Sequence, residues 1–106
     1  MNPQFKKGIL ELCVLVIVKQ KDQYGYELAQ NLTEKIAIAE GSLYPLLRRL
    51  TKEDYLQTYM AKSTEGPPRK YYRLTDEGER YMETLIHDWN IFQESVNHLI
   101  KEVYES

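Results

Sequence analysis

In the middle of the chain a helical pattern passes directly into a hairpin pattern, and this succession limits the fold more than any other feature. Three leucines, Leu43, Leu47 and Leu50, recur at i, i+4 and i+7 on one helical stripe that faces a core. Apolar and polar residues then alternate over residues 56–61 and again over 71–74, on either side of a turn-forming Gly-Pro-Pro. A short helix followed at once by a hairpin predicts a winged helix-turn-helix.

Pro45 limits where this helix can begin. Proline has no amide hydrogen, and it is best tolerated in the first turn, where amides lack helical partners. We therefore expect the helix to begin between residues 40 and 42, with Ser42 as its cap. Its first turn would then present Ser42, Tyr44 and Pro45 outward.

Basic side chains accompany both the helix and the hairpin. Arg48, Arg49 and Lys52 leave the leucine stripe, while Arg69 and Lys70 follow the rigid hairpin tip. The helical cations alone are equally typical of a solvated helix face. The adjoining hairpin favours a recognition helix in the major groove with a wing on neighbouring phosphates. Either arginine is long enough to contact guanine or phosphate, and the sequence does not distinguish them.

The charge is unevenly distributed along the chain. The net charge of −2 and the pI of about 5.7 would, taken alone, argue against a nucleic-acid partner. Residues 40–74, however, hold seven Lys/Arg against four Asp/Glu, whereas residues 75–106 hold two against eight. The basic charge therefore lies on the predicted reading surface and the acidic charge on the tail.

Residues 5–19 predict a first helix that is apolar almost all round, which requires neighbours on more than one side. Phe5, Gly8, Leu12 and Val16 share one of its faces. Gly8 leaves a gap there, which either allows close helix packing or makes room for a ligand.

A single cysteine, Cys13, excludes a disulfide within one chain and is typical of a reduced compartment. We expect it to be a small buried hydrophobe. The apolar run around it is about ten residues long, too short to span a membrane, and no secretory cleavage site precedes it. We therefore expect a cytoplasmic protein with no membrane partner.

A second helix is predicted over residues 24–32, where Tyr24, Leu28 and Leu32 recur at steps of four, with Asp22 as its cap. The short apolar segment at 36–38 is expected to be a turn or a small strand that closes the base of the wing.

The tail predicts one long helix from a Thr75 cap to about Tyr104. Its large apolar residues are spaced alternately by three and four, as in a coiled-coil seam. Each of them would forgo ~1.5–3 kcal/mol if left in water, so a partner subunit, the first helix or both should cover the seam. The seam comprises Met82, Leu85, Trp89, Phe92, Val96, Leu99 and Val103.

No catalytic constellation is recognisable, so we expect neither an enzyme nor a cofactor. His87 and His98 would stand ~16 Å apart along a helix, too far to bind one metal ion. The sequence also lacks a CxxC motif and a phosphate-binding glycine loop.

Four motifs resemble, in the same order, the PadR family of bacterial transcriptional regulators: ILELCVL, YGYEL, GSLYPLLRRL and GPPRKYYRLT. The resemblance extends over nearly the whole chain and is closest to the small-tailed branch, which includes multidrug-sensing repressors. It implies a mainly α (α+β) winged helix-turn-helix repressor that dimerises through a long C-terminal helix on a palindromic operator. Residues 1–74 would be the DNA-binding domain and residues 75–106 the dimerisation helix of the same compact unit.

The resemblance and the pattern together assign DNA contacts to the helix, the wing and the start of the second helix. Groove contacts go to Ser42, Tyr44, Pro45 and either Arg48 or Arg49; wing contacts go to Arg69 and Lys70, and a supporting phosphate contact goes to Tyr24. The dimer interface would comprise Leu85, Trp89, Phe92, Val96, Leu99 and Val103.

In the drug-sensing branch a tryptophan lines a flat pore at the dimer interface, and Trp89 stands at the matching position. Trp89 is therefore either a platform for an aromatic effector or a dimer-core residue. Gln93 stands where the drug sensors have an acidic residue, and Asp54 where the family has glycine. Asp tolerates a left-handed backbone, so the turn should survive. The implied pore lining is Phe5, Gly8, Leu12, Val16, Ile86, Trp89, Gln93 and Val96.

A different class of function is compatible with the same pattern. A winged-helix module could use the heptad tail to bind a protein and never contact DNA. Such a module would show no salt-dependent affinity for duplex DNA, which separates it from a repressor or an activator.

Overall fold

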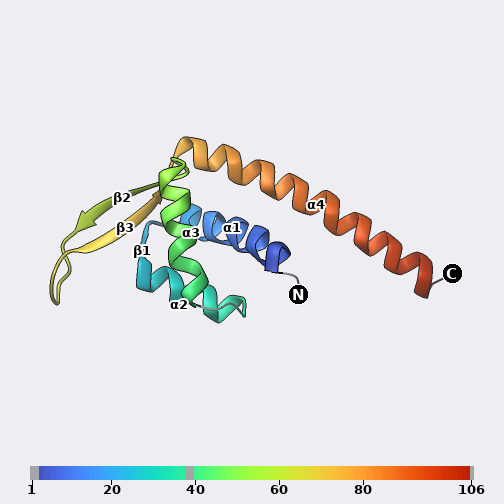
Figure 1. Ribbon diagram of the computed structural model, residues 1–106, viewed down its shortest axis with the longest axis horizontal. Helices are drawn as coiled ribbons and strands as arrows, with labels where there is room; N and C mark the ends of the chain where they lie inside the picture. The colour runs from blue at the N-terminus through green and yellow to red at the C-terminus, as the bar shows by residue number, and fades with distance from the viewer. Residues whose placement is uncertain (1–2, 38–39, 106) are drawn as a thin grey trace.

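The computed structural model describes residues 3–37 and 40–105, and side chains from residue 8 onward except that of residue 40. Three helices pack together between a long β-hairpin and a projecting C-terminal helix, and the molecule measures 60 × 26 × 21 Å (Figure 1). The elements are α1 (Pro3–Gln20), β1 (Gln23–Tyr24), α2 (Gly25–Lys35), α3 (Glu40–Lys52), β2 (Leu56–Ala61), β3 (Arg69–Leu74) and α4 (Asp76–Tyr104).

One hydrophobic core joins the first three helices. The predicted leucine stripe of α3 is confirmed, because Leu43, Leu47 and Leu50 are fully buried. Leu28 and Leu32 of α2 meet them in the same core, as their spacing of four predicts. The apolar circumference of α1 supplies the rest, with several of its faces occupied at once. The predicted winged helix-turn-helix is thus confirmed.

The hairpin forms the wing, and both of its predicted strands are confirmed. Strands β2 and β3 pair antiparallel, with Leu56 opposite Leu74 and Ala61 opposite Arg69, and β1 pairs with the other edge of β3. Strand β3 begins two residues earlier than predicted. Because residues alternate between the two faces of a strand, Tyr72 turns toward the core while Tyr71 turns away from it.

The strand alternative for residues 36–38 is wrong where the structure describes it. Ile36 lies in a bend, Ala37 has no regular secondary structure, and Ile38 falls outside the described residues. The edge of β3 is taken instead by β1, which pairs Gln23 with Tyr72. Two residues of strand carry no alternation pattern that a sequence could reveal.

Two predicted helix caps are wrong. Helix α2 begins at Gly25 after Tyr24, which makes no side-chain cap, and Asp22 instead accepts a hydrogen bond from the hydroxyl of Tyr59 at 2.6 Å. Helix α3 begins at Glu40, so Ser42 lies within its first turn and Pro45 lies in its second. Both residues remain exposed.

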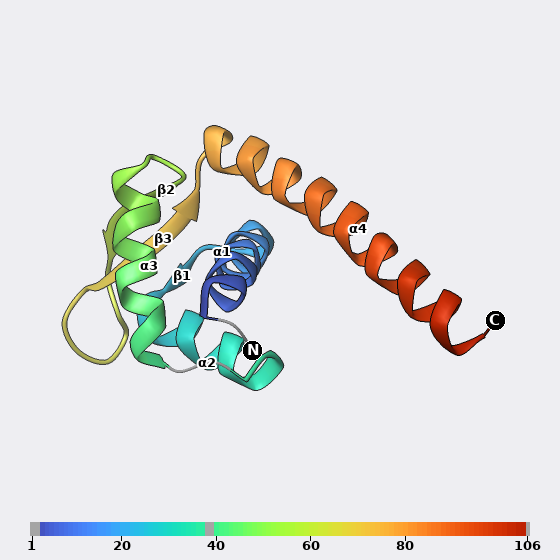
Figure 2. The same cartoon turned by 45° about the vertical axis from the view of Figure 1, so that its right-hand side comes forward.

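The predicted start of α4 is confirmed in detail. Thr75 Oγ1 accepts a hydrogen bond from the Gly78 amide at 2.9 Å, and the Thr75 hydroxyl donates to the Asp54 carbonyl at 2.7 Å. Asp54 has φ 66°, so it adopts the left-handed turn that was expected to survive the loss of glycine. The first half of α4 lies along the body, and its second half projects away from it (Figure 2). No helix in the described ranges is long and apolar enough to cross a membrane.

Candidate nucleic-acid interface and interhelical cleft

Helix α3 presents one polar face to the outside, because its leucines occupy the opposite face. Ser42, Tyr44, Pro45 and Arg48 are all exposed on this face. Tyr44 also packs inward against the start of α2, since a Cβ at Gly25 would lie 3.4 Å from its ring. Three residues assigned to groove contact by the sequence and one of the two candidate arginines, Arg48, therefore share one accessible surface.

The two arginines of α3 have different environments. Arg49 is half-buried and places Nη2 3.1 Å from Oε1 of Glu11 and Nη1 3.2 Å from Oε2 of Glu53. Partial burial lowers its pKa, but the hydrogen bonds and charges of these two carboxylates raise the pKa overall. Arg48 is exposed on the outer face. Arg49 thus links α3 to α1 through Glu11, while Arg48 faces solvent.

Successive residues of β3 point to opposite faces of the wing, so Arg69 and Lys70 diverge. The guanidinium of Arg69 lies 4.4 Å from the centre of the Tyr24 ring, on the outer face. Lys70 Nζ lies 6.0 Å from the centre of the Tyr72 ring, on the face that turns toward the core. Tyr24 is half-buried and serves as a platform for Arg69.

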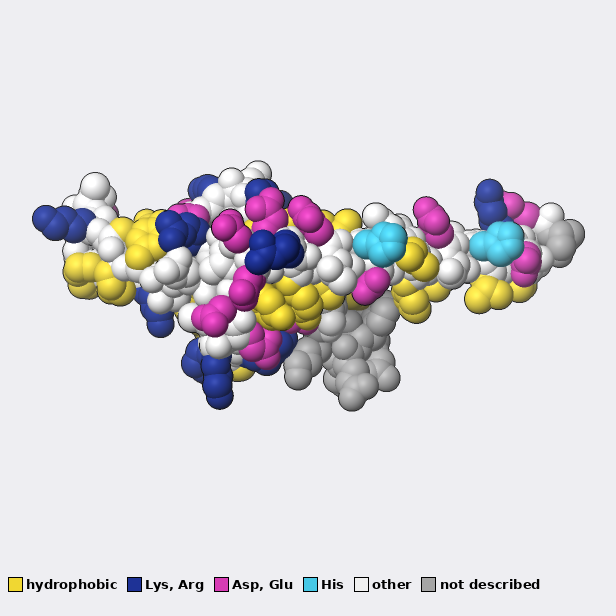
Figure 3. Space-filling model, turned by 90° about the horizontal axis from the view of Figure 1, so that it is seen from above, with side chains coloured by type: hydrophobic (Ala, Val, Ile, Leu, Met, Phe, Trp, Pro, Cys, Tyr) yellow, Lys and Arg dark blue, Asp and Glu magenta, His cyan; other side chains and the backbone are white. Residues whose placement is uncertain are grey.

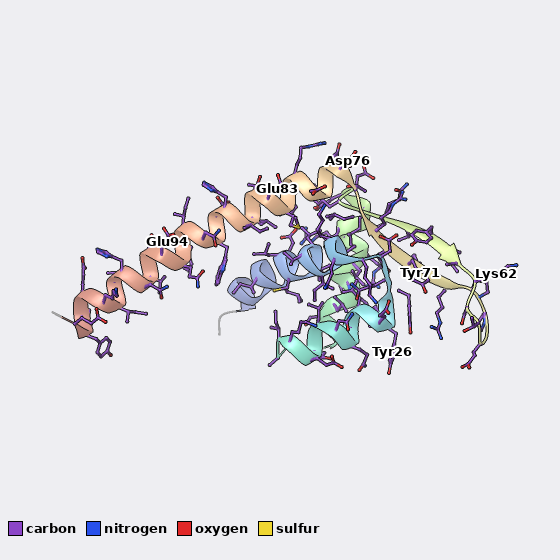
Figure 4. All side chains as sticks on the ribbon, turned by 180° about the vertical axis from the view of Figure 1, so that it is seen from behind. Tyr26, Lys62, Tyr71, Asp76, Glu83 and Glu94 are labelled. Carbon is purple, nitrogen blue, oxygen red and sulfur yellow. The ribbon has the colours of Figure 1, made fainter. Side chains whose placement is uncertain are left out.

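Tyrosines stiffen the outer face of the wing. The Tyr71 ring stacks on Tyr59 and meets Tyr24 edge-on, with both pairs of ring centres 5.6 Å apart. The hydrogen bond to Asp22 raises the pKa of Tyr59. In Figure 4, Tyr71 lies on the sheet near the body and Lys62 lies toward the far end of the hairpin. These ring contacts therefore hold in place the strand that carries Arg69 and Lys70.

A cleft of about 330 Å³ opens between α1 and the first half of α4. Of the pore residues predicted from the resemblance, Gly8, Leu12 and Trp89 line it. No described atom lies within 4 Å of a Cβ built at Gly8. Gly8 therefore borders open space, and it is not a point of close helix packing within the described part of the chain.

Four residues of the cleft were not predicted as ligand contacts. They are Ile9, Leu85, Asp88 and Phe92. Asp88 supplies an acidic side chain beside Trp89, although Gln93 occupies the position where an acidic residue was sought. The sequence spacing indicates this position for Asp88, because residues 85, 88, 89 and 92 share one helical face. Val16, Ile86, Gln93 and Val96 lie outside this cleft, and the side chain of Phe5 is outside the described residues.

The heptad seam changes environment along α4. Met82 is buried in the core and Leu85 and Trp89 are half-buried, whereas Leu99 and Val103 are 62% and 70% exposed. The second half of α4 projects from the body as an arm. Hydrophobic side chains gather along one edge of this arm, while histidine and acidic side chains occupy its upper side (Figure 3). The chain itself therefore covers the first part of the seam, and coverage of the second part by a partner subunit stays a prediction.

Other candidate chemistries find little support in the described part of the chain. No group of three or more His, Cys, Asp or Glu side chains that could hold a metal ion occurs among the described residues. His98 lies 3.0 Å from Glu102 on the exposed arm. Cys13 is half-buried, and burial raises the pKa of its thiol, which makes it a poorer nucleophile.

Comparison with known proteins agrees with this architecture. The profile of the transcriptional regulator PadR-like family matches residues 14–84. A PadR-like transcriptional regulator from Bacillus cereus has a TM-score of 0.84 and 40% sequence identity, over 92% of this chain and 97% of that one. An uncharacterized protein from Lysinibacillus sphaericus is 32% identical over 95 residues, which cover 86% of this chain and 87% of that protein.

A further relative is a longer regulator from another Bacillus species. The negative transcriptional regulator PadR from Bacillus subtilis is 22% identical over 100 residues, which cover 91% of this chain and 53% of that longer protein. The family match and the extended likeness to the Bacillus cereus structure lead to one conclusion: this chain belongs to the PadR-like family of transcriptional regulators.

Proposed function

We propose that this regulator is a homodimeric repressor that reads a palindromic operator with α3 and contacts the neighbouring phosphates with its wing. The observation that carries the proposal is the outer face of α3, where Ser42, Tyr44, Pro45 and Arg48 are exposed together beside the basic hairpin. A helix of this kind fits the major groove, and basic side chains on a wing fit the sugar-phosphate backbone.

Arg48 is the arginine we assign to the groove. Arg49 is held by Glu11 and Glu53, and moving it to DNA would leave the carboxylate of Glu11 buried without a cation. Arg48 carries no such cost, because it is already exposed. We therefore assign base or phosphate contact to Arg48 and a structural role to Arg49.

The wing contacts divide between the two faces of β3. Lys70 lies on the face that turns toward the body and Arg69 lies on the outer face, so the two cations can reach phosphates on either side of an inserted hairpin. Tyr24 supports this contact by holding Arg69, in place of the direct phosphate contact expected from the sequence.

A dimer built on the second half of α4 would cover its exposed seam. Leu99 and Val103 forgo burial on the isolated protomer, and each large apolar side chain gains about 1.5–3 kcal/mol when fully buried. Two-fold symmetry would then place the two copies of α3 on half-sites one helical turn apart, ~34 Å. Repression, as opposed to activation, is supported by the Bacillus subtilis relative.

We propose that the cleft between α1 and α4 binds a flat apolar or aromatic effector against Trp89. Its walls are largely apolar, and Asp88 adds one acidic group that would favour a cationic aromatic compound. Such a ligand would release the operator by favouring a dimer geometry in which the two recognition helices no longer match their half-sites. Multidrug sensing would follow from a cleft with few directional polar groups.

Fluorescence anisotropy on a labelled duplex from the protein's own upstream region tests both parts, at two salt concentrations and with or without phenylnaphthylamine, a neutral aromatic probe. Tight, salt-sensitive binding that the probe releases supports the ligand-responsive repressor. Tight binding that the probe leaves unchanged, although it quenches Trp89, would keep the repressor and remove the effector site. No binding to this or other promoter duplexes would favour the protein-interaction module.

A further inference from the structure

Glu11 is a buried acid in the middle of α1, a helix that carries no assigned DNA contact. Its side chain is among the few charged groups withdrawn from water, with the residue only 8% exposed. A carboxylate in this position is stable only if it is paired and hydrogen-bonded. Its partners therefore show what its burial achieves.

The same carboxylate oxygen of Glu11 holds two other helices. Oε1 accepts a hydrogen bond from the hydroxyl of Tyr81 on α4 at 3.0 Å, and it lies 3.1 Å from Nη2 of Arg49 on α3. Burial, followed by the charge of Glu11 and its hydrogen bond, raises the pKa of Tyr81 to about 12. The hydroxyl consequently remains a proton donor into the alkaline range.

A second attachment between α3 and α4 lies close by, at the turn that follows α3. The Tyr55 amide donates to the Leu50 carbonyl at 3.0 Å, and the Tyr55 carbonyl accepts from the Thr75 amide at 3.2 Å. The Tyr55 ring also stacks on Tyr81, with ring centres 4.2 Å apart and planes 13° apart. The backbone attachment at Tyr55 alone would let α4 rotate about that point. The hydrogen bond between Glu11 and Tyr81 adds a second point of attachment, and the two together define the angle of α4 relative to α3.

We propose that Glu11 and Tyr81 are positioning residues that lock the angle between α4 and the helical body that carries α3. In DNA binding, which rests on the proposed function above, this angle sets the separation of the two recognition helices in the dimer. The lever is long, because a 29-residue helix extends for ~43 Å. A rotation of roughly 5° at the junction would move its far end by about 4 Å.

The lock adjoins the cleft along both helices. Leu12 follows Glu11 directly and Leu85 lies one turn after Tyr81, and both residues line the cleft. A ligand that separates α1 from α4 there would stretch the bond between Glu11 and Tyr81. A change in the cleft would thus reach Glu11 and Tyr81 directly, and Glu11 is paired with Arg49 of the recognition helix.

Tyr81→Phe is the sharpest variant, because it removes the hydroxyl while keeping the ring stacked on Tyr55. Lys19→Ala is the matched control: it also breaks a link between α1 and α4, the exposed ion pair of Lys19 with Glu79, which involves neither Glu11 nor Arg49. Cooperative thermal unfolding of both variants would establish that each remains folded.

The measurement is the distance distribution between spin labels at two exposed sites, Gln30→Cys on α2 and Glu94→Cys on α4, in a Cys13→Ala background. Figure 4 shows Glu94 well out along α4, where rotation is amplified. Labelled chains are diluted with unlabelled chains, so that each dimer reports one internal distance. We expect a narrow distribution for the parent and for Lys19→Ala, and a broader or shifted one for Tyr81→Phe and Glu11→Gln.

Operator binding gives the functional readout. Tyr81→Phe should weaken binding roughly five- to tenfold and flatten its dependence on half-site spacing, while Lys19→Ala should change neither. The lock would be overturned if the distance distributions of Tyr81→Phe and Glu11→Gln had the same width and the same mean distance as that of the parent. A parent that binds no DNA would contradict the proposed function, whereas the distance measurement would still decide the lock.

Discussion

Gly78 occupies a position that no larger residue can take without moving the backbone. A Cβ there would lie 2.1 Å from the carbonyl oxygen of Tyr55 and 2.8 Å from a methyl group of Leu74. The close approach seats the first turn of α4 against the turn after α3. Gly78 therefore allows α4 to approach the end of α3 this closely.

Gly78→Ala should lower the free energy of unfolding by about 2–3 kcal/mol or more, because the clash is with backbone and cannot be relieved by a rotamer change. Urea unfolding followed by circular dichroism measures the loss. Gly8→Ala is the matched control: no described atom lies within 4 Å of a Cβ there, so the same substitution in a helix should be neutral or stabilising by up to about 1 kcal/mol. Equal stabilities of the two variants would contradict this account of the junction.

Asp88 is the acidic residue of the cleft, and its charge should select among ligands of similar shape. Asp88→Asn should weaken binding of naphthylmethylammonium up to about fivefold, since an exposed ion pair contributes at most about 1 kcal/mol. Binding of neutral naphthylmethanol, of nearly equal size, should be unchanged. Calorimetric titration of both compounds checks this, and an equal loss for both would show that Asp88 shapes the cleft without contributing charge.

Tyr81 should make stability depend on pH in the alkaline range. Its folded pKa of about 12 lies above the ordinary value of 10.0, so folding favours the protonated hydroxyl. This contribution is complete below pH 10 and is lost as the pH rises from 10 toward 12. The stability difference between the parent and Tyr81→Phe, measured by urea unfolding, should therefore shrink across that window. A difference that stays constant to pH 12 would show that the hydroxyl is not held by Glu11.

At the scale of single elements, α3 divides its two arginines between fold and function. Arg49→Ala would leave the carboxylate of Glu11 without its cation, and we expect a loss of about 1–3 kcal/mol in unfolding free energy. Arg48→Ala should unfold like the parent but bind operator DNA more weakly. Thermal unfolding and anisotropy, run on both variants, separate the roles, and a reversed pattern would assign the groove contact to Arg49.

The elements that the sequence predicted correctly are those that local chemistry determines. The leucine stripe of α3, the alternating strands of the hairpin and the Thr75 cap each depend on neighbours a few residues away. The elements it missed depend on distant partners. Asp22 resembles a cap for α2, yet its carboxylate is engaged by Tyr59, 37 residues further along the chain.

The candidate site follows the same division. Exposure of Ser42, Tyr44 and Pro45 follows from helical periodicity and was predicted. The difference between Arg48 and Arg49 depends on Glu11, which is distant in sequence and lies within an apolar run, so spacing alone could not reveal it. Asp88 follows from its helical spacing to Leu85 and Phe92, whereas the resemblance implied a ligand contact at Gln93, which lies outside the cleft.

At the scale of the whole molecule, charge and apolar surface are separated along the long axis. The wing carries basic side chains at one end, and the arm formed by the second half of α4 carries exposed apolar ones at the other (Figure 3). A partner on the arm would bury the apolar edge without covering the basic surface. Dimerisation and DNA binding would thus use opposite ends of the molecule.

The salt dependence of DNA binding tests the central claim most directly. The logarithm of the dissociation constant for a promoter duplex is measured against the logarithm of salt concentration, for the parent and for a variant carrying Arg69→Ala and Lys70→Ala. We predict tight binding by the parent that weakens steeply with salt, and a slope reduced by about two in the variant, because two phosphate contacts are lost. An unchanged slope would remove the wing from the DNA interface, and parent affinity that does not respond to salt would contradict the repressor itself.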